Sequence, residues 1–417
     1  MKLPLENILF SALKIVVNQI LPIIILPYLM KRLGDHQFGL MMIAQTVSLF
    51  GVATVEYGFN LTGVRRVVMI GPDRVQLLHL FRDINLVKLL FCLACVLLFS
   101  LFRLVSSASA DLLLAIACSF LTVLGAALQP NWFFMGLERF RVISLSQVAA
   151  RAVCLLSIFF VVAGPQDYLP ALVLFFLPTL LSAGIQLVFC RQFFSGMGAV
   201  RHRFRLAHLV RCAVDGVDIY MGQMAATLFA SVNTLVLGLV SGPADSGRYA
   251  FAEKLMRGLA VLSTPITEAI FPRVVAGLES NLSGALRFLS RILAWGVVAY
   301  GVGAVAAYVF FDAAMALLAL QRGSDIKQIF AVIAIVPALI FCNNICGTQV
   351  VLGLGHARLY RNVVLVSGLA LVAWSAALVM AWGVQGAAWA LLLGEIGICA
   401  GMVWASLKVV RYPWIWR

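Results

Sequence analysis

Apolar residues in this chain are gathered into long runs that short polar segments separate. About 20 consecutive apolar residues cross a bilayer as a helix. Runs of that length lie at approximately 8–30, 38–62, 84–104, 109–130, 143–164, 168–190, 213–240, 248–271, 288–311, 327–352, 361–382 and 384–407. They lack the alternation of apolar and polar positions that a membrane β-barrel needs. The pattern therefore predicts an all-α, polytopic membrane protein with 12 transmembrane helices.

Composition and charge agree with this interpretation. Hydrophobic residues make up 63% of the 417 residues and charged residues 12%, against roughly 45–50% and 25% in soluble proteins. The net charge of +14 suggests nucleic acid at first sight. In a membrane protein, however, excess Lys and Arg marks the cytoplasmic loops. The cations concentrate in alternate connections, which predicts that both termini are cytoplasmic and that nucleic acid is not a partner.

The chain also shows signs of an internal duplication. The segments Gly39–Gln45 and Gly247–Glu253 share the pattern G-x-x-x-x-A-[QE], and a basic stretch near 191–212 separates six predicted spans from six. We therefore predict two six-helix bundles, residues 1–200 and 201–417, related by a pseudo-twofold axis along the membrane normal. A central cavity between such halves suits alternating access.

Lys14, Arg151, Lys254 and Arg257 lie at depth inside predicted spans. Ionisable residues at such depths are costly and usually face a cavity or a partner. We expect these four, with Asn343 and Asn344, to bind an anionic substrate. The alternative for Arg257 is local neutralisation by Glu253, which lies one helical turn earlier. The alternative for Lys14 and Arg151 is that their long side chains reach the membrane surface.

Glu395 is the leading candidate for a carboxylate that couples transport to an ion gradient. It lies near the middle of the last span without a basic residue one turn away, and burial favours the neutral form of such a group. The alternative is a structural ion pair with a cation on another span, such as Arg257. Glu253 and Asp218 complete the candidate coupling set, although Asp218 could simply be solvated at the inner mouth. The sequence contains no nucleophile motif, nucleotide-binding loop or metal-ligand spacing, so we expect neither an enzyme nor a cofactor.

Three motifs resemble those of one transporter family. Residues 56–66 (EYGFNLTGVRR) are similar to the Y-G-F-N…R-R signature of Wzx-type O-antigen flippases. Residues 129–138 (QPNWFFMGLE) resemble that family's P-x-W-[FL]-x-x-G-[LI]-E segment, and residues 247–255 (GRYAFAEKL) its G-x-Y-x-x-A-E-K-[LI] stretch. The chain thus resembles the multidrug/oligosaccharidyl-lipid/polysaccharide exporter superfamily.

This resemblance implies a protein of the bacterial inner membrane that moves an undecaprenyl-pyrophosphate-linked oligosaccharide from the inner to the outer leaflet. The implied partners are that substrate, membrane lipids, and other assembly proteins such as a polymerase and a chain-length regulator. By motif position the resemblance places Lys254 and Arg257 in a cationic cavity. Two alternatives stay open here: a multidrug or cation exporter of the same superfamily, and a membrane polysaccharide polymerase or glycosyltransferase.

Overall fold

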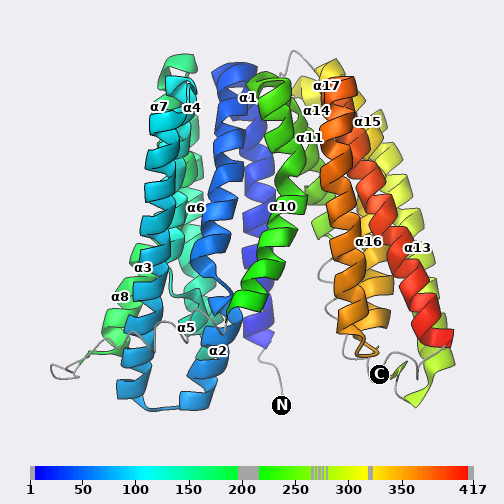
Figure 1. The fold of residues 1–417 in the computed structure, drawn as a ribbon, viewed down its shortest axis with the longest axis horizontal. Helices are drawn as coiled ribbons and strands as arrows, with labels where there is room; N and C mark the ends of the chain where they lie inside the picture. Colours follow the sequence, from blue (N-terminus) through cyan, green and yellow to red (C-terminus); the bar gives the residue numbers. More distant parts are fainter. Residues whose placement is uncertain are drawn as a thin grey trace. The chain divides into compact units, whose positions relative to one another are not determined.

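The computed structural model describes residues 5–195, 216–263, 280–317 and 323–411, together with positions 267, 270, 274, 277 and 278; for residues 5–23 it describes the backbone alone. Every regular element in these ranges is helical (Figure 1). The chain divides into two compact units, Met1–Leu228 and Phe229–Arg417. The boundary predicted at residues 200 and 201 lies outside the described residues.

The first unit contains α1 (Leu5–Glu56), α2 (Phe59–Ile70), α3 (Arg74–Val105), α4 (Ala110–Leu128), α5 (Asn131–Gly136), α6 (Phe140–Val161), η1 (Pro165–Asp167), α7 (Tyr168–Phe176) and α8 (Pro178–Phe193). Helix α10 (Val217–Val240) begins in the first unit and ends in the second. The second unit continues with α11 (Pro243–Val261), α13 (Leu282–Val309), α14 (Phe311–Leu317), α15 (Gly323–Ile333), α16 (Val336–Asn343), the π-helix η2 (Asn344–Leu352) and α17 (Ala357–Arg411).

Within the described residues, nine helical stretches are long and apolar enough to cross a membrane. The chain is therefore a multi-pass helical membrane protein. Two of the nine are far longer than one crossing needs, at 47 residues for Ile24–Ile70 and 54 residues for Arg358–Arg411. A glycine with non-helical backbone angles interrupts each: Gly34 (φ 78°) in α1 and Gly383 (φ 55°) in α17.

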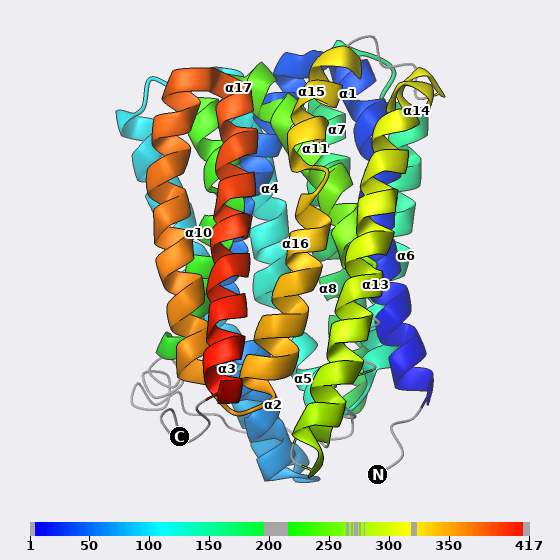
Figure 2. The same cartoon turned by 90° about the vertical axis from the view of Figure 1, so that its right-hand side faces the viewer.

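These two glycines reverse the chain direction. Glycine adopts a positive φ without the steric cost that a Cβ atom brings. Figures 1 and 2 show the result as two arms in α1 (two shades of blue) and two in α17 (orange and red). Gly34 and Gly383 lie in the short gaps that the sequence predicts between neighbouring spans.

The first unit is held together at one end by an aromatic core. The short helix α5 packs on α2, and Trp132, Phe133 and Phe134 are completely buried there. A Cβ atom on Gly63 of α2 would lie 2.9 Å from the Trp132 ring. Only glycine therefore permits this close contact. Two of the three family-like motifs, 56–66 and 129–138, thus form one packed corner.

A buried polar network lies beside this corner, where α4 ends. Lys88 of α3 is 3% exposed, and its ammonium donates a hydrogen bond of 2.7 Å to the backbone oxygen of Gln129. The Gln129 amide donates to Ser182 of α8 at 2.7 Å and accepts from Asn131 at 3.1 Å. Pro130 has no N–H group to continue the helix. Lys88 thus supplies both a donor and a positive charge at the C-terminus of α4.

Candidate functional site

The second unit contains a polar cluster that four of its helices build. We use this name for seven residues: Asn233 on α10, Tyr249, Glu253 and Arg257 on α11, Asn343 on α16, and Ser375 and Glu395 on the two arms of α17. Helix α11 begins at Pro243, directly after Gly242 (φ 93°). From that start, Tyr249, Glu253 and Arg257 recur every four residues and therefore share one face of the helix.

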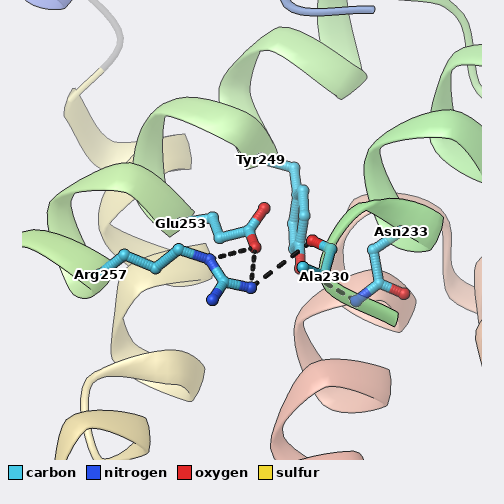
Figure 3. Close-up of polar contacts among 5 residues, drawn as sticks. All are labelled: Ala230, Asn233, Tyr249, Glu253 and Arg257. Atoms are coloured by element: carbon cyan, nitrogen blue, oxygen red, sulfur yellow. Dashed lines mark hydrogen bonds and ion pairs between the residues drawn. The ribbon is translucent and has the colours of Figure 1, made fainter. Parts of the chain in front are cut away.

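An ion pair within α11 forms the charged part of the cluster (Figure 3). The Arg257 side chain donates from Nε (2.8 Å) and Nη2 (2.7 Å) to the same oxygen, Oε1 of Glu253. Nη2 also reaches the backbone oxygen of Ala230 on α10 at 3.5 Å. The Glu253 side chain is 9% exposed, whereas 37% of the Arg257 side chain is exposed. The guanidinium is thus neutralised on one side and accessible on the other.

A chain of neutral polar groups extends the cluster away from the ion pair. The Asn233 amide donates to the Tyr249 hydroxyl at 3.0 Å, and the Ser375 hydroxyl donates to Asn233 Oδ1 at 2.5 Å. All three side chains are buried. Hydrogen bonds remove the cost of burying such groups in an apolar helical unit. They also tie α10, α11 and α17 together.

Glu395 lies at the other side of the cluster and is half-buried. The Asn343 amide donates to Glu395 Oε2 at 3.1 Å. The Asn343 Oδ1 atom is buried and has no hydrogen-bond partner in the described part of the chain. Arg257 interacts electrostatically with Glu395 as well as with Glu253. The described residues show no direct ion pair between Glu395 and Arg257, so Asn343 is the direct contact of this carboxylate.

The structure contains the local ion pair that the sequence analysis gave as the alternative for Arg257. The i, i+4 pair with Glu253 is formed. Arg257 is nevertheless accessible, because 37% of its side chain is exposed. Within the polar cluster, the cation of Arg257 accompanies two carboxylates, Glu253 and Glu395. The polar cluster therefore carries charges of both signs.

The other predicted site residues are distributed as follows. The side chains of Lys14 and Asp218 lie outside the described residues. Arg151 is half-buried on α6 of the first unit and makes an interaction there. Lys254 is half-buried next to Glu253 and is also engaged. Asn344 is half-buried at the start of η2, and its neighbour Asn343 makes the hydrogen bond to Glu395.

Sequence reasoning missed three members of the polar cluster: Asn233, Tyr249 and Ser375. Tyr249 had a usable signal, because it precedes Glu253 by one helical turn on the same face. Asn233 and Ser375 are 142 positions apart and meet only through helix packing. Among the described residues, no group of three or more His, Cys, Asp and Glu side chains could hold a metal ion.

Comparison with known proteins agrees with this fold. The family described as polysaccharide biosynthesis protein matches residues 5–277. A protein of Escherichia coli (strain K12) named "Putative O-antigen transporter" is 25% identical over 371 residues, which cover 87% of each chain. A protein of Shigella dysenteriae with the same name is 22% identical over 413 residues, covering 97% of this chain and 100% of the relative.

A solved structure shares the fold. The lipid II flippase MurJ, in an inward closed conformation, superposes with a TM-score of 0.70 at 12% identity, over 96% of this chain and 87% of MurJ. Fold and site together define a multi-pass helical membrane protein with charged groups inside its second unit. The chain belongs to the polysaccharide biosynthesis protein family. The resemblance to Wzx-type flippases is thereby confirmed at the level of the family, and the curated relatives are named for transport rather than for catalysis.

Proposed function

We propose that this chain is a flippase that moves a lipid-linked oligosaccharide from the inner to the outer leaflet of the bacterial inner membrane. The carrier lipid in this proposal is undecaprenyl pyrophosphate. Family membership and the two relatives named as O-antigen transporters support the substrate class. The observation that carries the proposal is the partly exposed Arg257 side chain within an apolar helical unit. Ionisable groups within a membrane are costly and commonly mark the pathway of a substrate or an ion.

The proposed topology has twelve spans and two bundles of six. The number follows from the nine apolar helical stretches of the described residues. Dividing the first at Gly34 and the last at Gly383 gives eleven spans, and α11 is the twelfth. The bundles correspond to residues 1–200 and 201–417, with both termini in the cytoplasm. Alternating access then requires that the bundles rock about a central cavity.

In the proposed mechanism, the pyrophosphate meets Arg257 on its exposed side. Nε and Nη2 are engaged by Glu253, and Nη1 makes no hydrogen bond in the described part of the chain. Nη1 is therefore available to a phosphate oxygen, and guanidinium groups bind phosphate well. Glu253 acts as the counter-ion that neutralises Arg257 when no substrate is bound. Lys254, Asn343 and Asn344 are proposed to add contacts, as are Lys14 and Arg151 of the first bundle.

Glu395 is the proposed coupling carboxylate. Asn343 orients Oε2, and the charge of Arg257 acts on the same group. A phosphate that binds Arg257 would compete with this attraction and make protonation of Glu395 easier. Substrate binding and proton uptake would in this way be linked. Asp218 is also proposed as one of the carboxylates that couple transport to the ion gradient.

The experiment uses a strain that lacks its own flippase and accumulates lipid-linked repeat units on the inner leaflet. Wild-type protein should restore surface polysaccharide, whereas Arg257→Ala should not. The control is Arg287→Ala on α13, because Arg287 is exposed and outside the polar cluster. Normal surface polysaccharide with Arg257→Ala, at equal protein level in the membrane, would contradict the role of this residue.

The coupling role is tested separately with Glu395→Gln. We expect this variant to transport at a rate that no longer depends on external pH, because a glutamine cannot take up a proton. The measurement is the rate of surface polysaccharide recovery in cells held at several pH values. A Glu395→Gln variant with the pH dependence of the wild type would remove Glu395 from the mechanism.

A further inference from the structure

The second unit contains a pocket that the polar cluster does not use. Its volume is about 640 Å³, within the size range of small-molecule sites. It lies at helix ends, lined by Tyr308 of α13, Asp312 of α14, Lys327, Gln328 and Ala331 of α15, and Gln385 beside the Gly383 turn of α17. Figure 2 shows α14, α15 and the α17 turn at one end of this unit.

The pocket is separate from the polar cluster. Gln385 and Glu395 lie on the same arm of α17, ten residues apart, which is about 15 Å along the helix axis. Along α11, Arg257 lies fourteen residues after Pro243, which is about 21 Å along the helix axis. In the proposed topology, this end of the second unit faces the outside of the cell, opposite the end at Arg411.

The charges in the pocket are already paired. The Lys327 ammonium forms an ion pair with Asp312 Oδ2 and lies 4.8 Å from the centre of the Tyr308 ring. The cation is therefore satisfied by a carboxylate and by an aromatic face. The Lys327 side chain is 23% exposed, whereas the Arg257 side chain is 37% exposed and keeps Nη1 for a phosphate oxygen. This pocket therefore suits the charged part of the substrate less well than the polar cluster does.

The remaining groups have the chemistry of a site for sugars. Gln328 and Gln385 each provide an amide that donates and accepts hydrogen bonds, as sugar hydroxyls also do. Asp312 is 65% exposed at its side chain and uses only Oδ2 in the described part of the chain, which leaves Oδ1 as an acceptor. Tyr308 is 44% exposed and combines an apolar ring with a polar hydroxyl. A pyranose has the matching combination of hydroxyl edges and a C–H face.

We propose that this pocket binds one uncharged sugar residue of the oligosaccharide on the release side of the membrane. The proposal rests on the flippase function above and adds a second point of contact. The polar cluster holds the pyrophosphate at mid-depth, and the outer pocket holds a sugar as the head group leaves. Holding the sugar there would oppose its return to the inner leaflet.

The test is binding of simple sugars to the purified full chain in lipid nanodiscs. The probes are the methyl glycosides of glucose, galactose, rhamnose and N-acetylglucosamine, observed by saturation-transfer NMR. We expect at least one to bind, and Tyr308→Ala and Gln385→Ala each to weaken it by about tenfold, the effect of one lost hydrogen bond or ring contact. Gln328→Ala, at an exposed position, should weaken binding without affecting folding.

The matched control is Phe310→Ala, because Phe310 is 66% exposed at the same end of α13 and does not line the pocket. It should bind the glycoside like the wild type, and inorganic pyrophosphate should not displace the sugar. The proposal is wrong if no glycoside binds the wild type, if the three pocket variants bind normally, or if pyrophosphate competes. Complementation of the flippase-deficient strain distinguishes failure of the sugar-binding proposal from failure of the flippase proposal. If the wild-type chain complements the strain but binds no glycoside, only the sugar-binding proposal is wrong.

Discussion

Arg257 uses the shape of its side chain as well as its charge. Two of its nitrogen atoms bind one oxygen of Glu253, which fixes the plane of the guanidinium and aims Nη1 away from the pair. Lysine would keep the charge but lose the planar fork. This distinction gives a sharper test of the site than removal of the charge.

We expect Arg257→Lys to retain part of the transport activity, about one tenth of the wild-type rate, while Arg257→Ala falls to background. The measurement is the amount of surface polysaccharide made per unit time by the complemented strain. Arg287→Lys serves as the control and should be unchanged. Equal activities of Arg257→Lys and Arg257→Ala would show that the positive charge alone has no role.

Lys88 gives a prediction about stability instead of transport. Replacement by alanine removes the donor to Gln129 and leaves a space between α3 and the end of α4. We expect Lys88→Ala to lower the free energy of unfolding by about 2 kcal/mol. Thermal unfolding of the purified protein in detergent measures this, with Arg103→Ala, an exposed change near the other end of α3, as the control. Identical unfolding temperatures would contradict the capping role.

At the scale of helices, small residues set how closely the spans pack. Gly125 of α4 faces α8, and a Cβ atom there would lie 2.5 Å from the backbone nitrogen of Leu180. Backbone cannot move aside as a flexible side chain can. Close approach at glycine is a common way for membrane helices to gain contact.

Gly125→Ala should therefore destabilise the protein by about 1–3 kcal/mol, the usual cost of overpacking. Gly184 of α8 has no atom within 4 Å of its Cβ position, so Gly184→Ala should leave stability unchanged or raise it slightly. Unfolding curves of the two variants make the comparison. A normal curve for Gly125→Ala would mean that α4 and α8 can separate at little cost.

The sequence predicts the helices well where local chemistry decides. The predicted span 109–130 corresponds to α4, which Ser109 caps by accepting from the Leu112 N–H, and the turn before α3 is capped by Asp73. The pair of Glu253 and Arg257 was foreseeable from helical spacing for the same reason. The short helix α5 and the π-helix η2 were not foreseen, because α5 lies in a predicted connection and η2 lies within the apolar run 327–352 without a break in composition.

The site was harder to predict than the helices. Asn233, Ser375 and Tyr249 contact one another because three helices pack together, and no spacing rule gives that arrangement. The outer pocket combines residues from four helices for the same reason. Sequence patterns identify which side chains are costly in a membrane; packing decides which of them meet.

At the scale of the whole molecule, the proposed topology can be tested with short epitope insertions. A tag after Ser107, between α3 and α4, should bind antibody on intact spheroplasts. A tag after Pro72, between α2 and α3, should bind only after permeabilisation, since this turn lies on the arginine-rich side. Accessibility of both tags, or of the Pro72 tag alone, would contradict cytoplasmic termini.

The central claim is that the chain itself carries a pyrophosphate-linked oligosaccharide across a bilayer through Arg257. The most direct measurement places purified protein in liposomes with undecaprenyl-pyrophosphate-linked oligosaccharide. The fraction of glycan open to an external glycosidase is then followed over time. We predict that wild-type protein exposes the protected pool and that Arg257→Ala liposomes match protein-free ones. Equal exposure with both proteins, or none with the wild type under an imposed proton gradient, would contradict the account.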